Sequence, residues 1–276
     1  MFPLTQTETM QMENVQNLVM IPHALQTASE HNSQGVYHLA CQNNGAAARS
    51  FQAALTIVNE YIAAGDDATS EYMEIKDDGS SQGLAWTSLR LEGSSMCDEG
   101  FFVYSHALSF RPRPGCVSAQ SDSYLASITL LFNIAQTYHR QGVKTQEQSK
   151  LRMAARFYGM CAGLAQNEEA LEDAGDASTI AMIAINNQAQ IHWQYLQEEE
   201  VALWLLSGLH DLVHEGEILL NPEDLDEIAL NMATMPLACS KPAAAAWNKQ
   251  TKEQTSERES EHTYILLSAL EISYFQ

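Results

Sequence analysis

The stretch INNQAQIHWQYLQEEEVALWLLSGL, residues 185–209, decides the fold of this chain. Two asparagines precede a small residue and a pair of ring-bearing residues, and an acidic run then leads into an apolar stretch that contains Gly208. Apolar residues on both sides of the acidic run recur at helical spacing, so we predict two consecutive helices with the glutamates at the start of the second. The polar cluster is then either a reactive site on one helix or one copy of a repeated unit.

Two other stretches follow the same spacing, which favours a repeated unit. HNSQGVYHLACQNNGAAARSFQAAL covers residues 31–55, and LFNIAQTYHRQG at residues 131–142 resumes after an interruption as MAARFYGMCAGL at residues 153–164. Each stretch has a small residue in its first helix and a ring three positions later. The small residues are Gly35, Ala135 and Ala189, and the rings belong to His38, Tyr138 and His192.

The second helices share a pattern of their own. A small residue is followed four positions later by a bulky one, and three positions after that by another small one. The triplets are Ala47, Phe51 and Ala54, then Ala154, Tyr158 and Cys161, then Val201, Leu205 and Gly208. Small residues at such positions let two helix backbones approach closely, and the rings fill the space between neighbouring pairs. The interruption in the second stretch predicts a longer connection between its two helices.

This spacing resembles the tetratricopeptide repeat, a pair of antiparallel helices of about 34 residues. The chain departs from the family pattern, because no copy has a tryptophan early in its first helix and no proline closes a copy. The resemblance implies a mainly α protein, a short α-solenoid of helical hairpins. It also implies that the first helices line a concave groove that binds a peptide or a helix.

The region between the first and second copies has a different texture. Turn-forming clusters such as DDGSS and RPRPG surround the short runs LAWTSLRL (84–91) and FFVYSHALSF (101–110), in which apolar and polar residues roughly alternate. The alternation predicts two strands, arranged as a β-hairpin-like insertion. Gly65 and Gly142 each follow a helical run, and we predict a helix end at both.

These textures divide the chain into five regions. We predict an N-terminal extension at 1–22, a first helical hairpin at 23–64, the strand-bearing insertion at 65–123, a second and third hairpin with a capping helix at 124–235, and a polar C-terminal tail at 236–276.

In such an array, one row of side chains on each first helix faces the groove. The row consists of Asn32, Val36 and Leu39, then Phe132, Gln136 and His139, then Asn186, Gln190 and Trp193. Its amides can bond a peptide backbone, while Phe132 and Trp193 can anchor apolar side chains of a partner. The alternative is that the insertion or the C-terminal tail covers these two rings. The row contains no lysine or arginine, so it does not predict a clamp for a partner's terminal carboxylate.

Composition restricts the partner. The chain has 276 residues, with 35 acidic and 14 basic side chains and a formal net charge of −21. This balance disfavours nucleic acid and anionic membrane surfaces, and it favours a basic or apolar protein or peptide. The five cysteines are scattered without a Cys-x-x-Cys pair, and the first fifteen residues lack the pattern of a signal peptide. We therefore expect reduced thiols and a cytoplasmic location, with the nucleus as the alternative.

We predict no catalytic, cofactor-binding or metal site. His210 and His214 lie four residues apart on a predicted helix, which suits a pair of metal ligands, but no HExxH motif and no cysteine accompanies them. The sequence also lacks a G-x-S-x-G motif and a P-loop. We expect a non-catalytic interaction or scaffold protein. One alternative is an enzyme that uses the insertion and the His/Asn face as its site, and the other is an acidic regulatory subunit that docks a basic partner.

Overall fold

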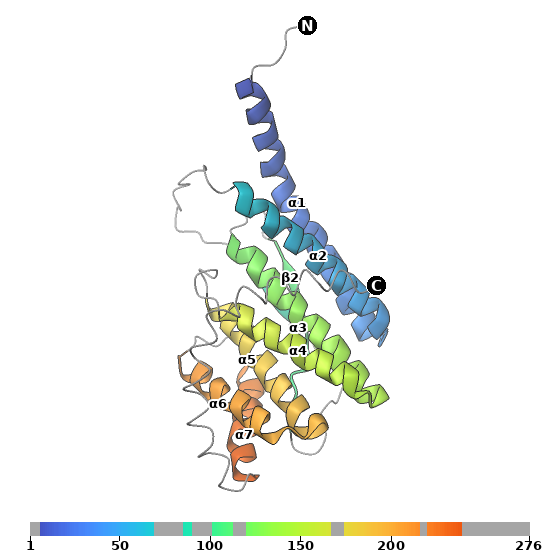
Figure 1. Cartoon of the computed structure of the whole chain (residues 1–276), viewed down its shortest axis with the longest axis vertical. Helices are drawn as coiled ribbons and strands as arrows, with labels where there is room; N and C mark the ends of the chain where they lie inside the picture. The colour runs from blue at the N-terminus through green and yellow to red at the C-terminus, as the bar shows by residue number, and fades with distance from the viewer. Residues whose placement is uncertain are drawn as a thin grey trace. The chain divides into compact units, whose positions relative to one another are not determined.

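A computed structural model of the chain describes residues 6–68, 85–89, 101–112, 120–166, 174–215 and 220–238. The helices are α1 (Gln6–Ala40), α2 (Asn44–Ala68), α3 (Gln120–Thr145), α4 (Gln148–Ala165), α5 (Ala174–Gln190), α6 (Glu199–Glu215) and α7 (Pro222–Ala238), with a π-helix, η2 (Ile191–Leu196), between α5 and α6 (Figure 1). The strands are β1 (Ala85–Leu89) and β2 (Ala107–Arg111). The prediction of a mainly helical chain with a small pair of strands is confirmed.

The chain divides into two compact units, Met1–Ile228 and Ala229–Gln276, and the second is described only over residues 229–238. Within the first unit, each of the helices from α1 to α6 packs against the next one along the chain. The central helix is α3, in which every residue from 125 to 137 is buried. It contacts α2 and α4 and also α1, α5 and β2. The first helices of the three hairpins, α1, α3 and α5, are therefore neighbours in that order.

The first hairpin closes tightly around Gly35. This glycine is buried, and a Cβ atom placed on it would collide with the ring of Phe51 on α2. Gln42 reverses the chain in a left-handed conformation with a φ of 59°. Asn43 then caps α2, because its side-chain oxygen accepts a hydrogen bond from the Ala46 N–H at 3.2 Å. The small residue that the spacing predicts at position 35 thus lies at a close helix crossing.

Several helices are longer than the periodicity predicts. The backbone of α1 is helical from Gln6, well before the predicted start of the first hairpin. Gly65 and Gly142 lie inside α2 and α3, so the prediction of helix ends at these glycines is wrong. A Cβ atom on Gly142 would lie 2.8 Å from Cγ of Leu151 on α4, so glycine here gives the second helix room. The extra residues of the second copy extend α3 and α4, which are separated only by residues 146–147.

The third hairpin differs from the prediction in its second helix. Val201 is 37% exposed, and a Cβ atom on Gly208 would meet nothing within 4 Å, so no close crossing occurs at these positions. The packed small-and-bulky pattern is instead Ala202, Leu206 and Leu209, one residue later, with Leu205 also buried. The π-helix η2 lies between the two helices, and its wider turns hold an extra residue. That extra residue accounts for the shift in register.

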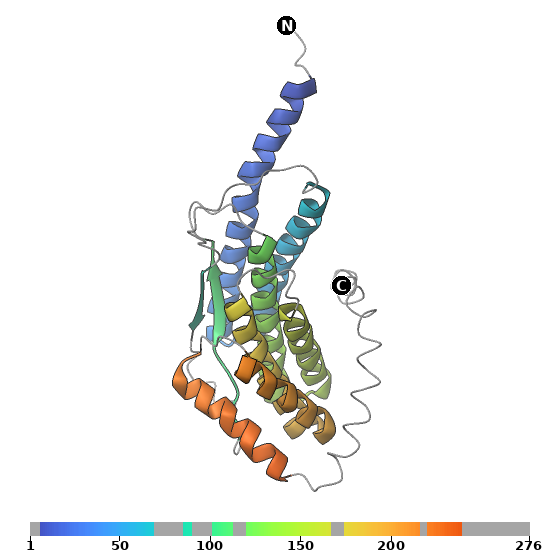
Figure 2. The same ribbon diagram turned by 90° about the vertical axis from the view of Figure 1, so that its left-hand side faces the viewer.

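The insertion supplies a two-stranded antiparallel sheet, as predicted. Trp86 of β1 lies opposite Phe110 of β2. The second strand is shorter than expected, since residues 101–106 carry no regular secondary structure. β2 packs against α1 and α3, and the strands lie beside these helices in Figure 2. The insertion therefore covers the face formed by the first helices.

Candidate functional site

Residues 101–111, here called the groove segment, pass across the face that α1, α3 and α5 form together. Polar side chains from all three helices bind the main chain of this segment. They are Ser29 and Asn32 on α1, Asn133 and Gln136 on α3, and Asn186 and Asn187 on α5. All six helix side chains are buried. The face therefore holds a polypeptide of the chain itself, bound through its backbone.

Asn133 grips Leu108 by both main-chain groups. The Leu108 N–H donates to Oδ1 of Asn133 at 2.9 Å, and Nδ2 of Asn133 donates to the Leu108 carbonyl at 2.6 Å. Asn32 donates to the same carbonyl at 3.2 Å, and its own oxygen accepts from Asn133 at 2.9 Å. Two helices thus share one amide cluster, which orients both side chains and leaves no main-chain group of Leu108 unpaired.

Asn187 grips Tyr104 in the same way, four residues earlier in the segment. The Tyr104 N–H donates to Oδ1 at 2.9 Å, and Nδ2 donates to the Tyr104 carbonyl at 2.8 Å. Nδ2 also donates to the hydroxyl of Tyr158 on α4 at 3.2 Å, which holds the amide in this orientation. We call Asn133 and Asn187 the two clamps, since each fixes the donor and the acceptor of one residue.

Single hydrogen bonds continue the contact on either side of the clamps. Gln136 donates to the carbonyls of Tyr104 and His106 at 3.3 and 3.2 Å. Ser29 donates to the Phe110 carbonyl at 2.7 Å, and Asn186 donates to the Phe102 carbonyl at 3.1 Å. These hydrogen bonds end on main-chain carbonyls of the segment, so they fix its path without selecting its sequence.

Side chains of the groove segment add apolar burial. Phe101, Val103, Tyr104, Ala107, Leu108 and Phe110 are all buried. The Tyr104 ring meets Phe132 on α3 edge-on, with ring centroids 6.1 Å apart. Burial raises the pKa of Tyr104 to about 12, against a smaller opposing effect of a hydrogen bond with Ser88. Full burial of each large side chain stabilises by about 1.5–3 kcal/mol, so the segment is an integral part of the folded core.

The predicted groove row lies where the segment binds, but the face is not open. Eight of the nine residues are buried, and three of them, Asn32, Gln136 and Asn186, bind the segment's main chain. Phe132 is core, as the alternative interpretation held. The groove segment supplies the backbone groups that these buried amides need. Binding of a partner at these residues stays a prediction.

The two clamps were absent from the predicted row. Asn133 and Asn187 each stand two residues before the small residue of their helix, Ala135 and Ala189. This shared position is the signal that could have identified them. Each clamp directly follows a member of the predicted row, Phe132 or Asn186, and a turn of 100° per residue separates the two positions on the helix.

Two further members of the row lie near η2. His139 is fully buried, with its ring edge-on to Tyr158 and to Tyr195 of η2, at centroid distances of 6.0 and 6.3 Å. Burial lowers the pKa of His139 to about 3, with a smaller opposing effect from the Gln190 side chain. The ring is therefore neutral at physiological pH. Trp193 lies within η2 and is partly exposed, so it is the one member of the row that a partner can reach directly.

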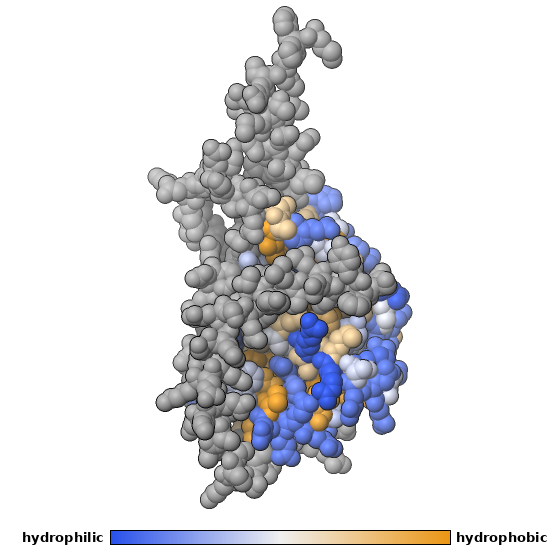
Figure 3. All heavy atoms as spheres, viewed as in Figure 1, coloured by the Kyte–Doolittle hydropathy of each residue, from blue (hydrophilic) through white to orange (hydrophobic). Residues whose placement is uncertain are grey.

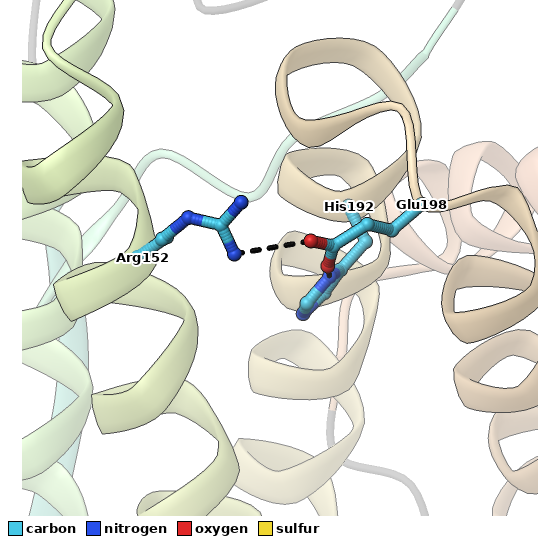
Figure 4. Close-up of polar contacts among 3 residues, drawn as sticks. All are labelled: Arg152, His192 and Glu198. Atoms are coloured by element: carbon cyan, nitrogen blue, oxygen red, sulfur yellow. Dashed lines mark hydrogen bonds and ion pairs between the residues drawn. The ribbon is translucent and has the colours of Figure 1, made fainter.

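A separate ionic cluster links the second and third hairpins. Glu198 accepts from Arg152 of α4 at 3.0 Å and pairs with Nδ1 of His192 in η2 at 2.7 Å, as Figure 4 shows. Burial acts to raise the pKa of Glu198, but the hydrogen bonds from His192 and Arg152 outweigh it, so the pKa lies below the usual value. The cluster ties the turn before α6 to α4. The sequence predicts that His192 packs between neighbouring hairpins. In the structure its ring pairs with the carboxylate of Glu198.

The described surface also contains an open groove of about 560 Å³. It is lined by Gln26, Ser29, Glu30, Ser33, Gln34, Tyr37, Arg111 and Pro112. Its position along α1, at the end of β2, separates it from the His192–Glu198 pair. That pair therefore has no part in the lining of this groove.

Histidines and acidic side chains do not gather into a metal-binding cluster within the described residues, where no group of three or more His, Cys, Asp and Glu is placed to hold an ion. His210 is exposed on α6, and the side chain of His214 lies outside the described residues. None of the described helices combines the length and the apolar character needed to cross a bilayer. Comparisons with protein-family models, with curated proteins and with solved structures gave no match.

Proposed function

We propose that this chain is a non-catalytic interaction protein, a short array of tetratricopeptide-like hairpins that binds a strand-like polypeptide across its first helices. One observation carries the proposal. The groove segment is held by buried amides that bond its main chain from α1, α3 and α5. Backbone-directed amides accept any polypeptide of suitable shape, which is the chemistry of a peptide-binding groove.

A partner peptide has to replace the groove segment in order to bind there. Loss of the segment to solvent would expose Tyr104, Leu108 and Phe110, at a cost comparable with the whole stability of a domain, about 5–15 kcal/mol. Exchange for a similar peptide costs far less, because the new occupant remakes the same contacts. A partner peptide must also compete with a segment that belongs to the same chain, whose effective concentration is of about millimolar order.

The surface outside the groove also favours the groove as the binding site. On the face seen in Figure 3, hydrophilic and hydrophobic residues are interspersed over the described surface. Exposed large hydrophobic residues of the first unit, which include Tyr37, Leu89, Met153 and Val201, belong to four different elements. They do not form one run along a helix face.

We also propose a cytoplasmic location, because Cys41 and Cys161 are free thiols.

The alternative of an acidic subunit that docks a basic partner requires a different surface. The helix side chains that bind the groove segment are uncharged amides and a hydroxyl. A basic partner would therefore use the acidic outer surface, and its binding would weaken as salt rises. Binding in the groove should change little with salt.

Peptide complementation tests the proposal. In the full chain, residues 101–110 are replaced by a Gly/Ser sequence of equal length, and a synthetic peptide FFVYSHALSFRP, residues 101–112, is added. We expect the peptide to bind saturably and to raise the melting temperature by mass action. A peptide of scrambled order is the control. A second measurement uses the unaltered chain with excess photo-crosslinking peptide, which should label α3 and α5. The proposal would be refuted if the peptide neither binds a replaced chain that circular dichroism shows to be helical nor labels the unaltered chain.

A further inference from the structure

The two clamps define a register for whatever occupies the groove. Asn187 holds both main-chain groups of Tyr104, and Asn133 holds both main-chain groups of Leu108. The clamps come from different helices, so the distance between them is set by the packing of α3 against α5. An occupant with one residue more or fewer between its two clamped positions leaves one clamp unpaired, and it turns a strand-like side chain to the opposite face.

The side chains at the clamped positions are selected by burial. Tyr104 is 1% exposed against Phe132 and His106, and Leu108 is fully buried. A ring at the first position keeps the edge-on contact with Phe132. An aliphatic residue at the second position fills a site that has no exposure to water. A charged residue at either position would be desolvated among neutral side chains.

The clamps also require an amide N–H at both positions. Each asparagine uses its oxygen to accept from the clamped residue and its nitrogen to donate to that residue's carbonyl. Proline has no N–H and would leave the asparagine oxygen unpaired in a buried site. Proline is therefore excluded at the two clamped positions.

Charge plays no part in this selection, although the chain carries a net charge of −21. Residues 101–110 contain no Asp, Glu, Lys or Arg, and the charges nearest to this stretch are Glu99 and Arg111. All six helix side chains that bind the segment are neutral at physiological pH. The groove is thus a neutral site in an acidic protein.

We propose that the groove selects an uncharged, strand-like segment of a partner in which an aromatic residue is followed four positions later by an aliphatic residue, with Asn187 and Asn133 as the residues that set this spacing. This inference rests on the proposed function, and it adds the chemical class of the ligand. It also makes partner recognition independent of the acidic surface.

A panel of peptides tests the register in the full chain whose residues 101–110 are replaced by Gly/Ser. The reference peptide is residues 101–112, and three others carry one inserted glycine between His106 and Ala107, Leu108→Pro, or Leu108→Lys. We expect each of these three to bind at least about 100-fold more weakly, because each leaves a buried clamp or charge unpaired. A peptide with Ser105→Ala, a position outside both clamps, should bind like the reference.

Substitution of the clamp itself separates recognition from folding. Asn133→Ala in the same chain should weaken the reference peptide about ten-fold or more, while the Leu108→Pro peptide, which already lacks the N–H, should lose less. Gln34→Ala, an exposed amide on α1, is the matched control and should change neither affinity. Equal affinity for the reference and register-shifted peptides would overturn this inference and leave the proposed function standing. Failure of every peptide to bind this chain, once circular dichroism shows that it is helical, would instead refute the proposed function.

The unaltered chain offers a test that does not depend on the replaced segment. Leu108→Pro, Asn133→Ala and the double variant are compared by urea unfolding of the full chain. If the clamp acts as described, the double variant is clearly less destabilised than the sum of the two single variants. Additive losses would show that Asn133 does not act through the N–H of position 108, and the inference would fall.

Discussion

The first and third hairpins share a spacing in the sequence but close differently. In the first, Gly35 lies against the Phe51 ring and a short turn joins the helices. In the third, η2 intervenes, and a Cβ atom placed on Gly208, where the spacing predicts a close crossing, would have no neighbour within 4 Å. The difference teaches that one extra residue in a turn shifts the buried face of the next helix.

The largest expected effect concerns a feature that the first and third hairpins share, a buried small residue on the first helix. Ala189 on α5 is fully buried, as its counterpart Gly35 is buried on α1. Ala189→Arg should destabilise by roughly 3 kcal/mol or more, since it places a charge and extra volume in a fully buried site. Ala135→Arg should do the same on α3, and Ala40→Arg at an exposed position is the control. Urea unfolding measures all three. A mild effect at Ala189 would mean that the third hairpin differs in both of its helices.

The next test compares the two glycines directly. Gly35→Ala should destabilise by about 1–3 kcal/mol, because its methyl group meets the Phe51 ring. Gly208→Ala should stabilise by about 0.5–1 kcal/mol, because alanine favours the helix and the site is open. Opposite signs in thermal unfolding are the expected result. A loss of stability in both variants would show that Gly208 also lies at a close contact, and the comparison would collapse.

A pH experiment tests the buried contact between the second hairpin and η2. Folding lowers the pKa of His139 from 6.5 to about 3, so the folded state takes up no proton at this ring while the unfolded state does. Stability is therefore fully present above pH 6.5 and falls between pH 6.5 and 3, by up to about 1.4 kcal/mol per pH unit. His139→Phe keeps an aromatic ring beside Tyr158 and Tyr195 and removes the titration. Unfolding at pH 7 and 5 should show a smaller acid loss in the variant, and an identical loss would contradict the assignment.

The smallest effect concerns the ionic link between the second and third hairpins. Glu198→Gln removes the carboxylate that Arg152 and His192 share, and we expect a loss of about 0.5 kcal/mol for a pair so open to solvent. Because the pKa of Glu198 is lowered, this contribution is present above pH 4.5 and is lost as the pH falls through the folded value. Glu147→Gln, which breaks a pair within the second hairpin, is the control. A large loss on Glu198→Gln would mean that this link, rather than η2, sets the third hairpin's register.

Local patterns predicted much of the fold. The helices of the three hairpins and the two strands were placed by periodicity, since helix and strand formation depends on residues close in sequence. Helix ends were less well predicted. By local rules Gly142 indicates a helix end, yet it lies inside α3, where the absence of a side chain leaves space for Leu151 of the next helix. That proximity arises only when the two helices pack.

The candidate site was likewise predictable from the sequence only in part. The sequence by itself determined that amides recur on the first helices and that residues 101–110 form an uncharged strand-like stretch, because composition and periodicity are written in consecutive residues. Only the tertiary structure decided that one binds the other. Leu108 and Asn133 are 25 residues apart, and Tyr104 and Asn187 are 83 apart, so their hydrogen bonds leave no local pattern. These bonds exist because buried amides and buried main-chain groups each need a partner, and packing brings the two sets together.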